Sequence, residues 1–396
     1  MSLLSISKYF PWSRVVVTGQ RTGQETVMTF IRPDRRYNPV CSRCGGNRTV
    51  IRSHHSRVVR DLNLGSHRSE IELSYRKVYC SDCDRVVVED LGVVVPWRRV
   101  TRRYALYVYQ LCKMMTVSDV SRHLGLDWKT VKDIDREFLE EDYGETDYSG
   151  LRLLAVDEIS IRRGHNYMTV VLDYDSGRVV WMGMERRSET LDAFFAGMTQ
   201  SQRDSIEAVV MDMWDPYIKA VRENLPNARI VFDLFHAVFA YGIMMDRIRA
   251  GEARKASKED SRVYRGARYL LLSNSVEGRD RRRQLRELLD LNEVISIAYI
   301  LKDKLKRIWL YKRRCYAEKA LEEWCNLARS SGNRLLANFA KRLKRHSYGI
   351  LNHCDYNMHT SRIEGVNNKI KVIKRDAYGY HDQRYFSLKV IQAFAA

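Results

Sequence analysis

Between residues 150 and 234, short apolar runs with the period of strands alternate with segments that have the period of helices. Five strands are predicted, in the segments 151–160, 166–185 (two strands around a turn at 175–177), 206–213 and 228–233. Residues 188–199 and 215–225 have helical spacing, with Ser188 and Asp215 as expected N-caps. The order β-β-β-α-β-α-β predicts a mixed sheet with helices packed against it.

A basic, helical pattern then extends from residue 235 to about residue 350. This stretch is too long for a loop, so it predicts a helical insertion before the last part of the sheet domain. In the helix expected at 361–376, one side of the helical wheel is apolar: Ile363, Val366, Ile370 and Ile373. The opposite side is polar and basic: Glu364, Asn368, Lys371 and Arg375.

Residues 116–139 have the pattern of a helix-turn-helix. Gly125 is expected to end a first helix, and Asp127 is expected to cap a second helix. The second helix is expected to present outward a set of side chains suited to phosphates and base edges: Trp128, Lys129, Lys132 and Arg136. A helical hairpin inside any core has the same spacing, so the pattern alone leaves both interpretations open.

Two Cys-x-x-Cys pairs flank a β-rich segment near the N-terminus. The cysteines are Cys41, Cys44, Cys80 and Cys83. Two residues between thiolates let both sulfurs reach one ion at about 2.3 Å, and two such pairs complete a tetrahedral zinc site. The alternative is four small core residues, which the paired spacing disfavours.

The composition points to a soluble protein that binds a polyanion. The 396 residues are 45% hydrophobic and 30% charged, which is typical of two or three folded domains and not of a disordered chain. The 68 Lys and Arg against 49 Asp and Glu give a formal charge of +19, which predicts nucleic acid as a partner, with a membrane surface as the weaker alternative. No targeting or membrane-spanning segment is recognisable, so a cytoplasmic, nucleoid-associated protein is expected.

Carboxylates follow two of the predicted strands. Asp157 is expected to end the first strand and Asp212 the fourth, where both acids would meet at one edge of the sheet and hold Mg²⁺. Two such ions can promote an in-line phosphoryl displacement. Alternation does not decide between Asp157 and its neighbour Glu158, and Asp233 has the spacing of a helix cap.

Glu364 has two competing interpretations. Ser361 and Glu364 have the spacing of a capping box, in which the glutamate folds back to the amide of the N-cap residue. The helical wheel instead places Glu364 with amide and basic groups that can follow a phosphate backbone, which favours a site. Four neighbouring residues extend this expected DNA contact, together with Asn368: Arg362, Lys371, Lys374 and Arg375.

The motifs LLAVDEIS, VVMDMWDPYIKAV, VFDLFH and SRIEGVNNKIKVIKRDAYGY, with the cysteine pairs and the helix-turn-helix, resemble DDE transposases of the insertion-sequence family called ISL-three. This resemblance implies an RNase H-like catalytic domain interrupted by a helical insertion. It also implies a catalytic triad of Asp157, Asp212 and Glu364 that binds two Mg²⁺ or Mn²⁺ ions. Asp233 and His236 resemble a secondary active-site motif of related transposases.

The expected architecture is an α+β multidomain chain in five segments. These are a zinc-ribbon-like module (1–97), a helix-turn-helix (98–148), the first part of an RNase H-like domain (149–250), a helical insertion (251–350) and the last part of that domain (351–396). The resemblance implies binding to terminal inverted repeats, DNA cleavage, strand transfer by a 3′-OH, one structural Zn²⁺, and a homodimer or higher assembly on DNA. Two alternatives remain: a catalytically inactive DNA-binding regulator, and an RNase H-like structure-specific nuclease.

Overall fold

The computed structural model describes residue 10 and residues 12–94, 98–162, 166–257, 260–264, 267–273, 277–358 and 361–395. The chain forms two compact units, residues 1–142 and residues 143–396. Each unit has its own apolar core. Of the helices in these described segments, none has the length and apolar character to cross a membrane.

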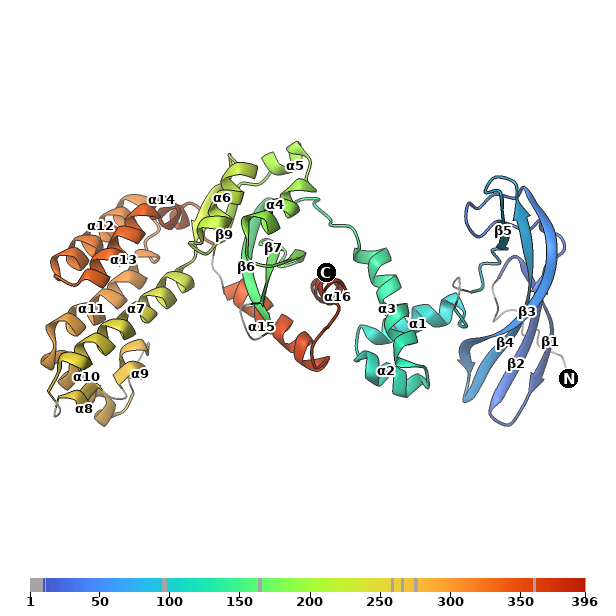
Figure 1. The fold of residues 1–396 in the computed structure, drawn as a ribbon, viewed down its shortest axis with the longest axis horizontal. Helices are drawn as coiled ribbons and strands as arrows, with labels where there is room; N and C mark the ends of the chain where they lie inside the picture. Colours follow the sequence, from blue (N-terminus) through green and yellow to red (C-terminus); the bar gives the residue numbers. More distant parts are fainter. Residues whose placement is uncertain are drawn as a thin grey trace. The chain divides into compact units, whose positions relative to one another are not determined.

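The first unit begins with a five-stranded sheet (Figure 1). Its strands are β1 (Val15–Thr22), β2 (Thr26–Pro33), β3 (Thr49–Leu64), β4 (His67–Cys80) and β5 (Arg85–Val88). The strand order is β1-β2-β4-β3, so the long hairpin of β3 and β4 has β3 at the edge, and β5 pairs with the end of β4. The cysteine pairs therefore lie at the ends of paired strands, as the sequence predicted. The preceding strands β1 and β2 were not predicted.

Three helices complete the first unit: α1 (Arg102–Cys112), α2 (Val117–Leu124) and α3 (Trp128–Tyr143). Gly125 ends α2 with a φ of 62°, a conformation that glycine adopts without a steric penalty. Asp127 caps α3, since its carboxylate accepts the amides of Lys129 at 3.0 Å and Thr130 at 3.2 Å. The predicted helix-turn-helix is thus confirmed.

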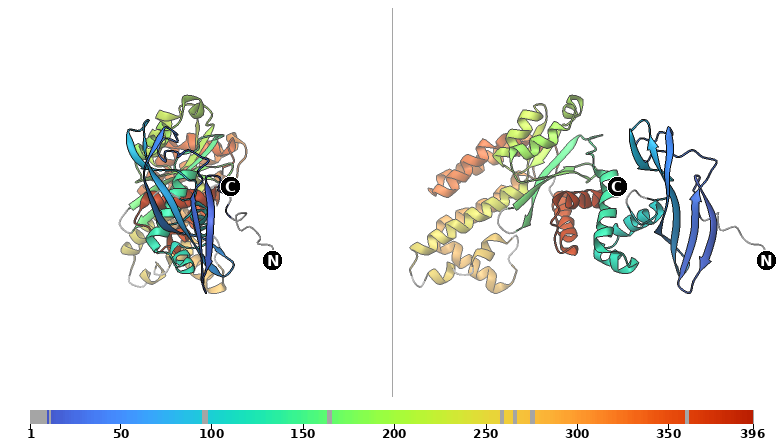
Figure 2. Two further views of the ribbon diagram at one scale, coloured as in Figure 1. Left: turned by 90° about the vertical axis from the view of Figure 1, so that its right-hand side faces the viewer. Right: turned by 45° about the vertical axis from the view of Figure 1, so that its right-hand side comes forward.

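The second unit is built on a mixed sheet with the strand order β10-β9-β6-β7-β8 (Figures 1 and 2). The strands are β6 (Leu153–Arg162), β7 (Asn166–Asp173), β8 (Val179–Met184), β9 (Ala208–Met211) and β10 (Arg229–Phe232). The first three pair antiparallel, whereas β9 lies parallel to β6 and β10 parallel to β9. The five predicted strands and their succession along the chain are confirmed.

Helices cover both faces of this sheet. On one face lie α4 (Ser188–Ala196) and α6 (Asp215–Asn224), with the short α5 (Gln200–Asp204) before β9. On the other face lie α15 (Ser361–Asp376) and α16 (Gln383–Phe394), drawn in red in Figure 1. The apolar side chains of each strand alternate between these two cores, which explains the continuous apolar runs in the sequence.

The predicted helical insertion separates β10 from α15. It consists of α7 (Leu234–Lys255), α8 (Ser261–Tyr264), α9 (Ala267–Leu272), α10 (Arg279–Leu291), α11 (Glu293–Ile308), α12 (Arg314–Ser330), α13 (Arg334–Arg345) and α14 (Ser347–Leu351), followed by the 3₁₀ turn η2 (Asn352–Cys354). The mixed sheet, the insertion and the N-terminal modules confirm the predicted fold class.

Three local predictions were wrong. Asp157 lies in the middle of β6 and not at its end, because β6 continues along β7 beyond the point where β9 stops. Ser188 and Asp215 are the first residues of their helices and not the caps, which are Arg187 and Trp214. Asp215 instead forms an ion pair with Arg345, 3.0 Å long.

Candidate active site

The parallel ladders of the second unit align three carboxylates in one row. Ala155 on β6 is the register partner of Val210 on β9, and Val210 is in turn the partner of Val231 on β10. Two positions further along the chain at each of these places stands an acid: Asp157, Asp212 and Asp233. The ladder continues at this level, because the amide of Asp233 donates to the carbonyl oxygen of Met211 at 3.2 Å.

Side-chain alternation turns this row toward α15. Ala155, Val210 and Val231, which stand two positions before the acids, belong to the apolar cluster that the sheet forms with α15 and α16. Side chains two residues apart point to the same face of a strand. In agreement, the side-chain amide of Asn367 on α15 donates a 2.6 Å hydrogen bond to Oδ2 of Asp157. Asp157, and not Glu158, therefore faces α15.

The imidazole of His236 lies among all three acids. Asp233 caps α7 by accepting the backbone amide of His236 at 3.2 Å, which holds the histidine in the first turn. Its Nε2 is 3.6 Å from Asp157 and 3.9 Å from Asp233, and its Nδ1 is 3.9 Å from Asp212. Burial lowers the pKa of His236, but the contact with Asp157 and the charges of the three acids outweigh burial and raise the pKa to about 9. The ring therefore carries a positive charge that offsets part of the acidic charge.

A second cation, Arg186, bridges the sheet's two faces at the same place. Its guanidinium contacts Asp212 and Glu158, each at 3.0 Å, and its carbon lies 4.4 Å from the centroid of the Trp214 ring. Burial raises the pKa of Glu158 to about 7, against the lowering effect of Arg186. Arg186 and His236 together neutralise part of a cluster that would otherwise concentrate negative charge.

Glu364 lies in the first turn of α15, three residues before Asn367. Its side chain is exposed and borders a groove that Asp233 also lines. Within the described part of the chain Glu364 makes no hydrogen bond or ion pair, neither as a cap nor with Asp157 or Asp212; the side chain of Ser361 is outside that part. The structure thus brings Asp157 and Asp212 together around His236, whereas, among the described residues, Glu364 is linked to them only through the groove that it shares with Asp233. Carboxylate oxygens of Asp157, Asp212 and Glu364 do not all lie within 4.8 Å of one another.

The cluster offers oxygen atoms that suit a hard divalent cation. On the face that α15 covers, the buried Oδ1 of Asn367 has no hydrogen-bond partner among the described residues. Buried polar atoms rarely lack a partner, so this oxygen leaves room for a ligand that the chain does not supply. Carboxylate and amide oxygens are donors that Mg²⁺ and Mn²⁺ accept and that softer metals avoid. The residues present therefore fit a divalent cation.

The four paired cysteines meet in the first unit. Their sulfurs all lie within 4.8 Å of one another, with Cys41 3.9 Å from Cys83 and Cys44 3.7 Å from Cys80. The backbone amide of Gly46 donates to the Cys44 sulfur at 3.4 Å. Four converging sulfurs at the ends of two knuckles fit a structural zinc ion.

Comparison with known proteins identifies three consecutive domains. A zinc-finger of transposase IS204/IS1001/IS1096/IS1165 matches residues 38–83, and the helix-turn-helix domain of transposase family ISL3 matches residues 89–139. The ISL3 DDE domain, described as a transposase, matches residues 154–390, which is more than half of the chain. The chain belongs to the ISL3 family of transposases.

Two transposases, from Bordetella parapertussis and Mycobacterium tuberculosis, are similar to this chain over most of its length. The transposase for insertion sequence element IS1001 of Bordetella parapertussis is 37% identical over 93% of this chain and 92% of its own length. The transposase for insertion sequence element IS1557 of Mycobacterium tuberculosis, in strains CDC 1551 / Oshkosh and ATCC 25618 / H37Rv, is 27% identical over 89% of this chain and 85% of its own length. The predicted family and the DNA transposase function are thereby confirmed, and the helix-turn-helix makes this family member a DNA-binding protein.

The residues predicted to contact DNA differ in how much of their side chain is available. On α3, Trp128, Lys129 and Arg136 are exposed, and Lys132 is half-buried with its Nζ 5.9 Å from the Trp128 ring centroid. On α15, three are exposed and contact solvent: Asn368, Lys371 and Arg375.

Two of the candidate DNA-binding residues on α15 donate hydrogen bonds to backbone carbonyl oxygens of the same chain. Arg362 donates to the carbonyl oxygens of Tyr174 and Asp175 at 2.7 and 2.9 Å, and the half-buried Lys374 donates to that of Ser160 at 3.5 Å. For Arg362 and Lys374, part of the hydrogen-bonding capacity therefore holds α15 against the sheet.

Sequence reasoning missed three residues of this ISL3 site: Glu158, Arg186 and Asn367. Glu158 was considered only as a competitor of Asp157, and Arg186 lies in a loop without any motif. A usable signal existed for Asn367, which follows Glu364 by three positions and so shares its side of the helix. The helical wheel drew attention to Asn368 instead.

Proposed function

We propose that this transposase cuts DNA at the ends of its insertion sequence and joins the freed 3′-OH to target DNA, with Asp157, Asp212 and Glu364 as the ligands of two Mg²⁺ or Mn²⁺ ions. The observation that supports the proposal is the register of β6 and β9, in which Ala155 pairs with Val210, two positions before Asp157 and Asp212. The helix α15, which packs on this face of the sheet, carries Glu364.

The protein groups have separate tasks in this mechanism. Asp157 and Asp212 are fixed by the backbone amides of the residues that follow them, at 2.8 and 2.6 Å, so their remaining oxygen atoms are oriented before DNA arrives. Glu364 completes the ligand set from α15. Divalent cations bound there would activate the attacking oxygen and stabilise the leaving oxygen in an in-line displacement.

Arg186 and His236 compensate for the acids when the substrate is absent. The side chains of Arg186 and His236 both contact Asp212, and His236 also contacts Asp157. A DNA phosphate brings negative charge toward this cluster, and two positive side chains at its border lower the cost of that approach. We assign Asp233 to holding His236 through the helix cap and not to binding the cations.

The first unit supplies recognition. We propose that α3 enters the major groove of the terminal inverted repeat. The zinc ion would fix the ends of β3, β4 and β5 relative to one another. Both ends of an element must be joined in one reaction, so a dimer or a higher assembly on DNA is expected. Phosphate contacts make this binding strongly dependent on salt concentration.

The test is a cleavage and strand-transfer assay on labelled DNA that carries the element ends, with Mg²⁺. Asp157→Asn, Asp212→Asn and Glu364→Gln keep the shape of each side chain and remove the charge that holds the cation. Each variant is expected to bind the ends with unchanged affinity and to lose both cleavage and joining. Asp215→Asn is the matched control. Asp215 is an exposed acid next to the site, where it pairs with Arg345, and the variant should remain active.

The outcomes separate the competing functions. Cleavage by all three triad variants would show that the acids are wrongly assigned. If the wild type binds the ends without cutting any DNA, the chain is a regulator. Cutting of branched DNA without any joining would instead identify a structure-specific nuclease.

A further inference from the structure

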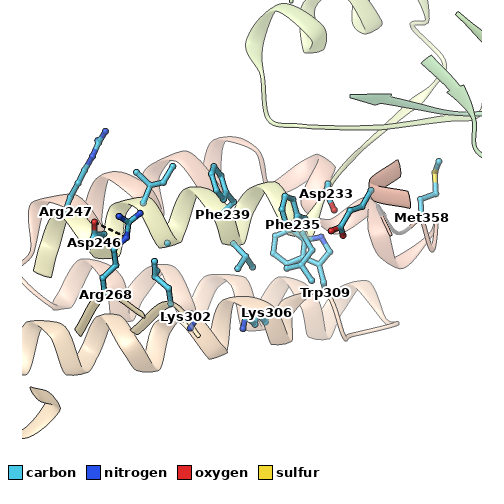
Figure 3. A pocket seen from close by; sticks show the side chains of 16 residues that line it. Asp233, Phe235, Phe239, Asp246, Arg247, Arg268, Lys302, Lys306, Trp309 and Met358 are labelled. Atoms are coloured by element: carbon cyan, nitrogen blue, oxygen red, sulfur yellow. Dashed lines mark ion pairs between the residues drawn. The ribbon is translucent and has the colours of Figure 1, made fainter. Parts of the chain in front are cut away.

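A groove of about 960 Å³ leads away from the acidic cluster along α7 (Figure 3). Its walls come from α7, α9 and α11, and its near end is formed by Asp233 and Glu364. Asp233 and Met358 lie toward one end of the labelled side chains in Figure 3, and Arg247 and Arg268 lie toward the other. At 1.5 Å per residue, α7 carries the groove about 20 Å away from Asp233.

Apolar side chains line the middle of the groove and are unusually exposed. Phe235 is 54% exposed, Phe239 is 60% exposed, and Ile243 is 45% exposed. Successive members are four residues apart, so they form one stripe along α7. The two phenyl rings are nearly parallel, at 14° with centroids 6.3 Å apart, and Trp309 lines the wall beside them. Exposed aromatic rings in a row are typical of surfaces that bind another molecule.

The charge of the groove changes along its length. Arg247 and Arg268 line the part beyond the phenylalanines, and Lys306 lines the wall that α11 forms. Lys302 also lines this wall, but it is only 4% exposed and its Nζ donates to the carbonyl oxygens of Leu271 and Ser273 at 2.7 and 2.6 Å, so it adds little to the basic surface. The one acid that lines this part, Asp246, is paired with Arg249 at 2.8 Å and with Arg268 at 3.5 Å. The groove therefore has an acidic end at the proposed metal site, an aromatic middle and a basic far end.

We propose that this groove binds unpaired nucleotides of the DNA strand end beside the cut, with bases against Phe235 and Phe239 and phosphates toward the basic end. The acidic end, the aromatic middle and the basic end follow one another as a single DNA strand would require, if that strand starts at the proposed metal ions and continues along α7. Stacking requires a base whose face is open, and bases inside a duplex are covered by their neighbours. The helical insertion would thus hold terminal base pairs open. This inference rests on the DNA cleavage proposed above.

The test compares two DNA probes with the full-length protein. One is a duplex that carries the element end, and the other is the same duplex with mismatched, unpaired terminal bases. The wild type is expected to bind the unpaired end more tightly, because the cost of opening it has been removed. The double variant Phe235→Ala/Phe239→Ala should bind the unpaired end about tenfold or more weakly and the paired end almost normally.

Two controls make the result specific. Tyr316→Ala removes an aromatic ring of similar exposure, 54%, from α12 of the same insertion but outside the groove, and should bind both probes like the wild type. Phe239→Trp keeps a stacking surface and should keep the preference. Both phenylalanines are exposed, so their loss is not expected to unfold the protein, which a thermal melt checks.

The inference is overturned if the double variant keeps the full preference for unpaired ends, or if Tyr316→Ala loses as much. It is also overturned if the double variant binds both probes like the wild type but has a lower assembly mass than the wild type in light scattering. In that case a second copy of the chain, and not DNA, would cover the groove. Asp157→Asn separates the inference from the proposed function, because it should lose cleavage and keep the preference. A wild type that never cuts but shows the phenylalanine-dependent preference refutes cleavage and leaves the nucleotide site standing.

Discussion

Asp157 is held in place by two different elements. Its Oδ1 accepts the amide of Glu158 at 2.8 Å, and its Oδ2 accepts the side chain of Asn367 from α15 at 2.6 Å. A carboxylate with both oxygens engaged has lost rotamer freedom before any cation binds. Partners that orient a metal ligand in this way often matter almost as much as the ligand itself.

Asn367→Ala is therefore expected to impair cation binding at the proposed site. Removing a residue that orients a ligand costs about 10–100-fold in metal affinity or activity. We expect the Mg²⁺ concentration for half-maximal cleavage to rise by a factor in this range, while affinity for the element end stays the same. Cleavage measured across a Mg²⁺ titration gives the first quantity, and a binding assay without catalysis gives the second.

Asn368→Ala is the matched control for this prediction. Asn368 is exposed and is the next residue on the same helix, and its removal should leave the Mg²⁺ requirement unchanged. If both variants raise the requirement equally, α15 has been disturbed as a whole and the specific role of Asn367 is refuted.

The orientation of single acids was beyond sequence reasoning. Alternation places Asp157 and Glu158 on opposite faces of β6 but does not say which face α15 covers. That choice depends on the apolar residues of α15 and α16, which are separated from β6 by the whole helical insertion. The position of Asp212 was predictable, because it directly follows the buried run of β9.

At the scale of elements, α3 has the features of a recognition helix. Val131, Ile134 and Leu139 form the buried side of α3. Lys129 and Arg136, on the same helix, are exposed. Lys129→Ala and Arg136→Ala are each expected to weaken end binding. If the lost contact is to a phosphate, the dependence of log affinity on log salt concentration should become shallower by about one.

A salt titration of binding affinity checks this prediction. Lys341→Ala, which removes an exposed lysine from α13, is the control and should change the slope less. If Lys129→Ala, Arg136→Ala and the control have equal slopes, the basic residues of α3 act only through the net charge of the protein.

Element types were largely predictable, and element ends were not. The period of apolar residues gave the strands of the second unit, its flanking helices and the helix-turn-helix. The helix starts at Ser188 and Asp215 were misplaced by one residue, because both residues also fit the first turn and Asp215 is held there by Arg345. The strands β1 and β2 were missed, since their polar exposed faces interrupt the apolar pattern.

At the scale of the whole molecule, the two units have separate cores and should respond separately to loss of zinc. The cysteine cluster joins the ends of β3–β5, so its removal should open that sheet. Chelation under reducing conditions is expected to abolish hydrogen-exchange protection of β3–β5 while β6, β9 and β10 stay protected. Hydrogen exchange with mass spectrometry measures both units in one experiment.

Cys44→Ser should reproduce the effect of chelation without a chelator. Cys315→Ser is the matched control, since Cys315 is exposed and lies outside the cluster, and its exchange pattern should equal that of the wild type. Unchanged protection of β3–β5 in Cys44→Ser would contradict a structural role for the metal.

Asp157 in β6, Asp212 directly after β9 and Glu364 in α15 are proposed to surround the same cations. Fe²⁺ substituted for Mg²⁺ is oxidised to Fe³⁺ by added hydrogen peroxide, which gives hydroxide and a hydroxyl radical; the radicals cut the protein backbone close to the metal, and mass spectrometry locates the cuts. If the three residues bind the same cations, cuts are expected around residues 157, 212 and 364 that excess Mg²⁺ suppresses and that Asp212→Asn abolishes. Cuts that leave the region around Glu364 intact, or that persist in Asp212→Asn, would contradict this proposal.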